Sequence, residues 1–194
     1  MSHNYFTTDT KPARKAILIV MGGLPGTGKT SLSKVLSLRL DAVYLRIDTI
    51  EQALHRQAAF KNGNEGYLVA NMVAEDNLRL GHVVIADSVN PISITRDAWR
   101  EIARRCQVDI LEIEVVCSNK KQHRRRVEER KADIPEYKLP TWDEVVNRQY
   151  DAWKTKNLTI DTSELSVTEA VEQILKTYQL ALKPNSANIT ERQP

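Results

Sequence analysis

The chain contains the stretch Gly23-Leu24-Pro25-Gly26-Thr27-Gly28-Lys29-Thr30 directly after the apolar run Ile17-Leu18-Ile19-Val20-Met21. The stretch matches the pattern G-x-x-x-x-G-K-[ST], which binds phosphate when it joins a buried strand to a helix. Glycines let backbone N–H groups curl around phosphate oxygens. The unpaired N–H groups at the start of the following helix also attract anions. The stretch therefore predicts a binding site for the triphosphate of a nucleotide.

Two side chains at the end of this loop have chemical roles in the prediction. Lys29 can reach the terminal phosphates, and the Thr30 hydroxyl can hold Mg²⁺. Together with Ser31, the loop residues are predicted to bind ATP. Asn119-Lys120 resembles the start of the guanine-binding pattern N-K-x-D, but position 122 is Gln, so the sequence favours ATP over GTP.

Length and composition are those of an ordinary globular protein. The 194 residues fit one domain, with 41% hydrophobic and 27% charged residues. The net charge of +3 does not by itself indicate a polyanionic partner. No apolar stretch approaches the roughly 20 residues needed to cross a bilayer, and residues 1–14 lack an apolar signal core. We therefore expect a cytoplasmic protein without a membrane partner, and the sequence contains no signal for an oligomeric state.

Apolar runs and helical patterns alternate along the chain. This alternation predicts an α/β fold with a five-stranded parallel sheet flanked by helices. The domain is expected at residues 15–182, between flexible tails at 1–14 and 183–194. Expected strands are 16–21, 43–45, 83–86, 108–117 and 158–160; expected helices follow the glycine-rich loop and lie at 51–57, 67–80, 93–105, 119–131, and from 141 and 166 onward.

Two carboxylates follow expected strands, and ligands of such sheets bind at the carboxyl ends of the strands. Asp48 follows the second strand and Asp87 follows the third. Phosphoryl transfer needs one group that orients or deprotonates the attacking oxygen and another that holds Mg²⁺. We assign Asp48 as the base and Asp87 as the metal ligand, beside Thr30. The two roles could be exchanged, and either residue could instead cap the next helix.

Basic side chains crowd the expected helix at 119–131. They could form a solvated charged face, a nucleic-acid patch, or a lid that closes on ATP. Arg126 and Arg130 stand four residues apart, so they share one helix face and can grip one ligand. Aromatic residues do not interleave with the basic ones, so the sequence favours a lid, at about residues 119–142. An arginine at a transferring phosphate is worth about 10³–10⁵ in rate.

The chain resembles bacterial AAA-type ATP-binding proteins that are described as predicted kinases. The resemblance rests on the glycine-rich loop, Asp48, Ile85-Ala86-Asp87, Arg126-Val127-Glu128-Glu129-Arg130 and the stretch 138–145. That group belongs to the P-loop kinases and is similar to polynucleotide 5′-hydroxyl kinase, chloramphenicol phosphotransferase and zeta toxin. The resemblance implies a P-loop NTPase fold, Mg²⁺ and ATP, Asp48 as catalytic base, and Arg126 and Arg130 as lid arginines.

One departure from the polynucleotide kinases concerns the acceptor. Those enzymes usually place an arginine three residues after the aspartate, where this chain has Glu51, which would repel a phosphate. Asp48-Thr49-Ile50-Glu51 instead looks like the Asp-Ser-x-x-Glu stretch of chloramphenicol phosphotransferase. The sequence thus favours a neutral or cationic hydroxylated small molecule. Expected acceptor-side residues are Asp48, Glu51, His55, Arg56, Tyr67, Asn71, Asp87 and Arg96, and Asp161-Thr162 is expected near the adenine.

The leading hypothesis is therefore a kinase that transfers the γ-phosphate of ATP to a small-molecule hydroxyl. Lys29, Asp48, Arg126 and Arg130 are its expected catalytic residues. Two alternatives stay open on the sequence alone: a polynucleotide or nucleoside 5′-hydroxyl kinase, and a switch protein that hydrolyses ATP and signals through a partner. Nucleic acid is less favoured as a partner than a small molecule.

Overall fold

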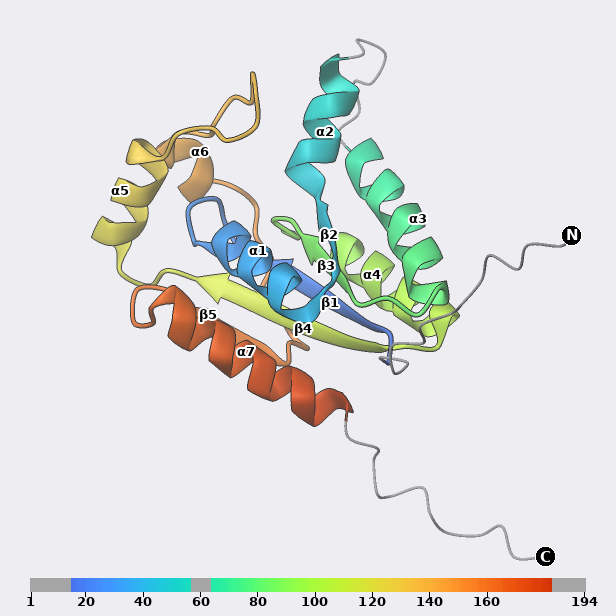
Figure 1. Ribbon diagram of the computed structural model, residues 1–194. Helices are drawn as coiled ribbons and strands as arrows, with labels where there is room; N and C mark the ends of the chain where they lie inside the picture. The colour runs from blue at the N-terminus through green and yellow to red at the C-terminus, as the bar shows by residue number, and fades with distance from the viewer. Residues whose placement is uncertain (1–14, 57–63, 183–194) are drawn as a thin grey trace, which may run out of the picture.

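The computed structural model describes residues 15–56 and 64–182. Within them, five strands form one sheet in the order β2-β3-β1-β4-β5, and every strand pair is parallel (Figure 1). The predicted five-stranded parallel sheet is confirmed. The strands are β1 (Ile17–Gly22), β2 (Val43–Arg46), β3 (Val84–Asp87), β4 (Asp109–Val116) and β5 (Leu158–Asp161).

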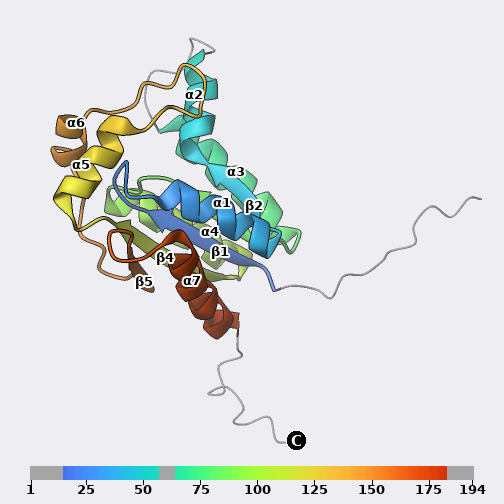
Figure 2. The ribbon, with the colours of Figure 1, turned by 60° about the vertical axis from the view of Figure 1, so that its left-hand side comes forward.

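Helices cover both faces of the sheet, because successive residues of the buried strand β1 point to opposite sides. Ile17, Ile19 and Met21 pack in the cluster that includes α1 and α7, whereas Leu18 and Val20 pack in the cluster of α3 and α4. Figures 1 and 2 show these two outer layers. The helices are α1 (Lys29–Leu40), α2 (Ile47–Arg56), α3 (Glu65–Arg79), α4 (Ser93–Cys106), α5 (Lys120–Glu129), α6 (Trp142–Val146) and α7 (Val167–Leu182).

Three local expectations differ from the structure. Helix α5 ends at Glu129, so Arg130 follows the helix with an extended backbone and does not share one helix face with Arg126. Helix α2 begins at Ile47, directly after β2, so Asp48 lies in its first turn and not in a strand-exit loop. Helix α6 ends at Val146, so the helix expected from 141 onward is short and does not reach Trp153. Trp153 instead packs in the core cluster of α3 and α4. The expected tails at 1–14 and 183–194 lie outside the described residues. Among the described residues, no helix is long and apolar enough to cross a bilayer.

Candidate active site

The glycine-rich loop between β1 and α1 has a backbone that favours glycine. Gly23, Gly26 and Gly28 have φ angles of 146°, 85° and 94°, in the left-handed region that other residues rarely adopt. A Cβ atom on Gly26 would also collide with Val127 of α5. Gly28 caps α1 without a side-chain hydrogen bond, so the first N–H groups of that helix are left for a ligand. The loop therefore has the form that an anion-binding site at a helix N-terminus requires.

Lys29 lies at the bottom of this loop and is only 5% exposed. Burial lowers the pKa of its ammonium group, while the nearby charges of Asp87 and Asp48 act in the opposite direction. The two carboxylates that the sequence predicted at the strand ends thus both lie close enough to affect the pKa of Lys29. A triphosphate would add further negative charge and favour the protonated amine.

Asp87 is 1% exposed, and its two oxygens have different environments. Tyr44 donates its hydroxyl hydrogen to Oδ2 at 2.7 Å, whereas Oδ1 is buried and has no hydrogen-bond partner in the described part of the chain. A buried carboxylate oxygen without a donor suits a hard cation, and Thr30 offers a hydroxyl oxygen at the start of α1. Thr30 and Asp87 therefore fit the predicted Mg²⁺, which would neutralise phosphate charge when bound.

Two adjoining cavities meet at the end of the glycine-rich loop. The smaller one, about 360 Å³, borders the loop. The larger one, about 780 Å³, extends toward α2 and α3. Lys29, Thr30 and Arg130 line both, and the predicted acceptor-side residues Asp48 and Glu51 line the larger one. We call the larger one the acceptor cavity. The smaller one is lined by Gly26, Gly28, Lys29, Thr30, Ser31, Arg126, Glu129 and Arg130.

The first part of the predicted lid is anchored to the glycine-rich loop. Arg126 of α5 donates to the hydroxyl oxygen of Thr162 at 2.7 Å and to its backbone carbonyl at 2.9 Å. Thr162 in turn donates to the carbonyl of Thr27 at 2.6 Å. His123 Nε2 lies 2.8 Å from the carbonyl of Pro25. Arg126 and Thr162 are therefore both held against the glycine-rich loop.

Asp161, which was expected near the adenine, makes its hydrogen bonds within the chain. Its Oδ1 accepts hydrogen bonds from the backbone N–H groups of Ser118 and Ser163. Although burial opposes them, hydrogen bonds from the side chains and the backbone of Ser118 and Ser163 lower the pKa of Asp161 to about 2. The carboxylate thus fixes the loop after β5, and the side chain lines neither cavity. Its neighbour Thr162 makes the contact with the glycine-rich loop.

The second part of the lid folds back onto α2 (Figure 2). Asp133 accepts two hydrogen bonds from the guanidinium group of Arg46, both at 2.8 Å, and one from Lys34 at 2.8 Å. Arg56 pairs with Glu136 at 3.2 Å and also donates to the carbonyl of Pro135. Arg56 was expected to contact the acceptor, but it does not line the acceptor cavity because its guanidinium group is bound to the lid.

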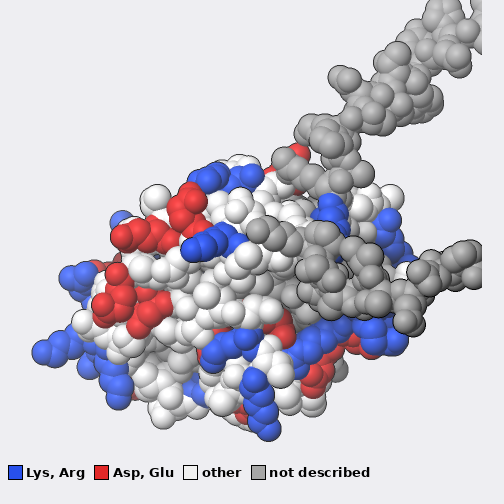
Figure 3. Space-filling view, turned by 90° about the horizontal axis from the view of Figure 1, so that it is seen from below, with Lys and Arg blue, Asp and Glu red and all other residues white. Residues whose placement is uncertain are grey.

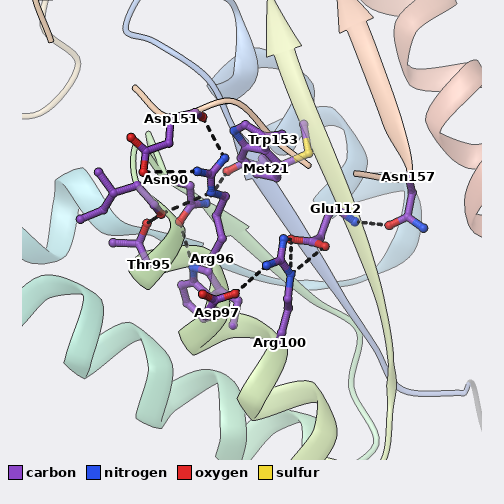
Figure 4. Close-up of polar contacts among 12 residues, drawn as sticks. Met21, Asn90, Thr95, Arg96, Asp97, Arg100, Glu112, Asp151, Trp153 and Asn157 are labelled. Carbon is purple, nitrogen blue, oxygen red and sulfur yellow. Dashed lines mark hydrogen bonds and ion pairs between the residues drawn. The ribbon is translucent and has the colours of Figure 1, made fainter. Parts of the chain in front are cut away.

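Arg96 is likewise not a cavity residue. Its side chain is 3% exposed and lies over the ring of Trp153 (Figure 4), with 4.9 Å between the guanidinium carbon and the ring centroid. It donates to the carbonyls of Asp151 at 3.0 Å and Ile92 at 3.3 Å. Arg96 therefore fastens the segment after α6 to α4. Its neighbour Thr95 lines the acceptor cavity instead.

Several cavity residues were not predicted. Arg46 lines the cavity from the end of β2, and Tyr137 and Arg148 line it from the lid and from the segment after α6. Burial, together with the charges of Asp48 and Glu51, raises the pKa of Tyr137 to about 12. No sequence pattern marks these residues, because the lid that brings Tyr137 to α2 is remote in sequence.

Glu51 lies one turn after Asp48 on α2, against Gly66 of α3. Burial and the charge of Asp48 raise the pKa of Glu51 to about 7, although Arg148 acts against this shift. The other charged group that raises it is Glu65 of α3. The carboxyl group is therefore held where its ionisation is unfavourable.

This position predicts a pH-dependent effect of Glu51→Gln on stability. The ordinary pKa of the carboxyl is 4.5, so between pH 4.5 and about 7 the folded protein binds more protons here than the unfolded chain does. Stability from this group is present at low pH and is lost as the pH rises toward 7. Glutamine does not ionise, so the Tm of the variant relative to the unsubstituted protein should be higher at pH 8 than at pH 5. Thermal melts at both values measure this, and an equal difference at both would contradict the raised pKa.

Comparison with known proteins assigns this chain to a family. Residues 18–152 match the model of the family described as AAA domain. The chain belongs to this family. No curated protein sequence matches it significantly.

Solved structures share the fold of this AAA domain chain at low sequence identity. The Mycobacterium tuberculosis APS kinase CysC in complex with AMPPNP and APS is 19% identical, with a TM-score of 0.67, over 86% of this chain and 99% of that one. Chaetomium thermophilum Kti12 in complex with ADP-AlF3 is 20% identical, with a TM-score of 0.67, over 86% and 100%. A Sinorhizobium meliloti gluconokinase is 15% identical, with a TM-score of 0.60, over 87% and 95%. The fold is that of the P-loop kinases.

Proposed function

We propose that this protein is an ATP-dependent phosphotransferase that moves the γ-phosphate of ATP to a hydroxyl group of a small molecule. One observation carries the proposal: a single cavity of about 780 Å³ is lined both by Lys29 and Thr30 of the phosphate-binding loop and by the carboxylate side chain of Asp48. Its volume lies in the range of about 300–1,000 Å³ that is typical of small-molecule sites. The structures of similar fold contain a nucleotide analogue in the CysC complex and ADP-AlF3 in the Kti12 complex.

Each site residue has its own role in the proposed phosphoryl transfer. Asp48 accepts the proton of the acceptor hydroxyl as its oxygen bonds to the γ-phosphorus, and the bond from that phosphorus to the β–γ bridging oxygen breaks. The products are ADP and a phosphate monoester. Lys29 and the lid arginines Arg126 and Arg130 hold the negative charge of the phosphates. Thr30 and Asp87 would hold Mg²⁺, which shields the same charge.

The lid surface supports a small acceptor over a nucleic acid. Arg124 and Arg125 of α5 pair with Glu128 and Glu129 one turn further on, so these cations belong to a solvated, mixed-charge face. On the face shown in Figure 3, basic and acidic side chains are also interspersed. An extended nucleic acid usually needs a continuous basic surface.

The test is ADP production from ATP across a panel of hydroxylated compounds, with products identified by mass spectrometry. The panel contains sugars, amino alcohols, hydroxylated antibiotics, nucleosides and a 5′-hydroxyl oligonucleotide. A small-molecule phosphate monoester formed together with ADP supports the proposal. Phosphorylation of the oligonucleotide alone would identify a nucleic-acid kinase. ADP release without a phosphorylated compound, stimulated only by added protein, would identify a switch.

A further inference from the structure

We infer that the acceptor carries a cationic nitrogen, such as a protonated amine, in addition to its reacting hydroxyl, and that Glu51 binds this cation. The inference rests on the proposed function, because it concerns the cavity in which the hydroxyl would meet Asp48. It names the substrate class as amino alcohols and Glu51 as the residue that selects them.

The first observation is that the Glu51 carboxylate has no partner. Among the described residues it makes no hydrogen bond and no ion pair, although it lines a cavity that contains several basic side chains. By contrast, Glu144, at the cavity edge, accepts hydrogen bonds from Thr141 in a capping box. A half-buried carboxylate with no donor leaves a desolvated negative group for a ligand to satisfy.

The second observation is an orphaned acceptor on the neighbouring helix. The side-chain oxygen of Asn71 of α3 is buried, has no hydrogen-bond partner in the described part of the chain, and belongs to a cavity-lining residue. Together with Asp48 and Glu51 it makes three groups with acceptor oxygens along the α2–α3 side. An ammonium group has three donors and no acceptor, so it complements this set.

The basic side chains that line the acceptor cavity also line the smaller cavity, are paired with an acidic residue, or are exposed. Lys29 and Arg130 also line the phosphate-side cavity, and Arg46 is bound through two nitrogens to Asp133. Lys138 and Arg148 are exposed, whereas Asp48 and Glu51 are half-buried. The charge of Arg148 acts on Glu51, but burial and the charge of Asp48 outweigh it in their effect on the pKa of Glu51. The inner part of the acceptor cavity therefore has an excess of negative charge.

Apolar side chains also line the cavity and suit a carbon skeleton. They are Leu68, Val89, Ile92, Ile94, Ala98 and Leu139. Asp48 and Glu51 are related by i, i+3 on one helix, a spacing that puts their Cβ atoms about 5–6 Å apart. The geometry points to an acceptor whose cationic nitrogen is separated from its hydroxyl by a few bonds.

The experiment compares amines with derivatives in which the nitrogen carries no charge. Glucosamine and straight-chain amino alcohols are assayed with ATP beside their N-acetyl derivatives, and glucuronic acid serves as an anionic sugar. Since a hydrogen bond to a charged group is worth about 1.5–3 kcal/mol, the amines should have a kcat/KM about 10- to 100-fold higher than their N-acetyl counterparts. The isosteric variant Glu51→Gln should reduce that ratio to below about threefold. Glu172→Gln, on α7 and paired with Arg39, is the matched control and should keep the ratio.

The outcomes separate the two proposals. Transfer to neutral or anionic alcohols without preference for amines overturns the inference about the cation and leaves the proposed kinase function standing. An amine preference that persists in Glu51→Gln overturns the role of Glu51. No phosphate monoester from any compound, with ATP bound to the protein, overturns the proposed function and the inference with it. The preference of the unsubstituted protein is measured first and does not depend on whether a variant folds.

Discussion

Replacing Lys29 by alanine should abolish phosphoryl transfer and weaken the binding of ATP. The ammonium group is 5% exposed at the end of the glycine-rich loop, where Asp48 and Asp87 are the carboxylates that act on it. Removing it leaves the phosphates without their buried cation. A charged hydrogen bond of about 1.5–3 kcal/mol corresponds to a 10- to 100-fold rise in the Kd for ATP. Loss of a transition-state donor lowers turnover by a further ~10²–10³.

Titration with ATP by calorimetry and an ADP-production assay measure the two effects of Lys29→Ala separately. Arg39→Ala is a suitable control, because Arg39 lies on the same helix but is exposed and pairs with Glu172 of α7. The Kd for ATP and the turnover of the control should both stay within about threefold of the values of the unsubstituted protein, as is usual for exposed pairs. If Lys29→Ala binds ATP and turns over as well as the control does, the glycine-rich loop is not the phosphate site.

The fold was predictable because its determinants are local in the sequence. The apolar run before Gly23 is a strand buried on both faces, and the glycines that follow have backbone angles that only glycine adopts easily.

The start of the C-terminal helix was also predictable from a local pattern. The capping box from Ser166 to Glu169 forms as expected, and α7 begins at Val167.

The candidate site was predictable only in part, because long side chains take their direction from distant partners. Lys29 was predicted from the glycine-rich loop, Asp48 from a strand end and Arg130 from helix spacing, and the three line one cavity. Arg56 and Arg96 follow the expected strands in sequence, but other residues bind their side chains and neither lines the acceptor cavity. The first is held by Glu136, 80 residues away, and the second by the segment around Asp151, 55 residues away. Only the folded chain brings such partners together.

Replacing Asp48 by asparagine should remove transfer to the acceptor while leaving ATP binding almost unchanged. Asp48 lies in the first turn of α2 and lines the acceptor cavity, but it does not line the smaller cavity beside the phosphate-binding loop. Asparagine keeps the size of the side chain and cannot accept the hydroxyl proton. A general base contributes about 10²–10⁴ in rate, so kcat should fall by that factor while the Kd for ATP changes by less than about threefold.

The dependence on Mg²⁺ distinguishes Asp48 from Asp87, whose roles the sequence left exchangeable. Asp87→Asn alters the carboxylate whose buried Oδ1 has no partner in the described part of the chain, so the Mg²⁺ concentration for half-maximal activity should rise at least about tenfold. In Asp48→Asn the residual activity should keep the Mg²⁺ dependence of the unsubstituted protein. Tyr44→Phe is the matched control for Asp87, because it removes the hydrogen bond to Oδ2 and leaves the carboxylate in place. Near-normal transfer by Asp48→Asn, or a raised Mg²⁺ requirement in that variant instead of in Asp87→Asn, would refute Asp48 as the base and assign it to the metal.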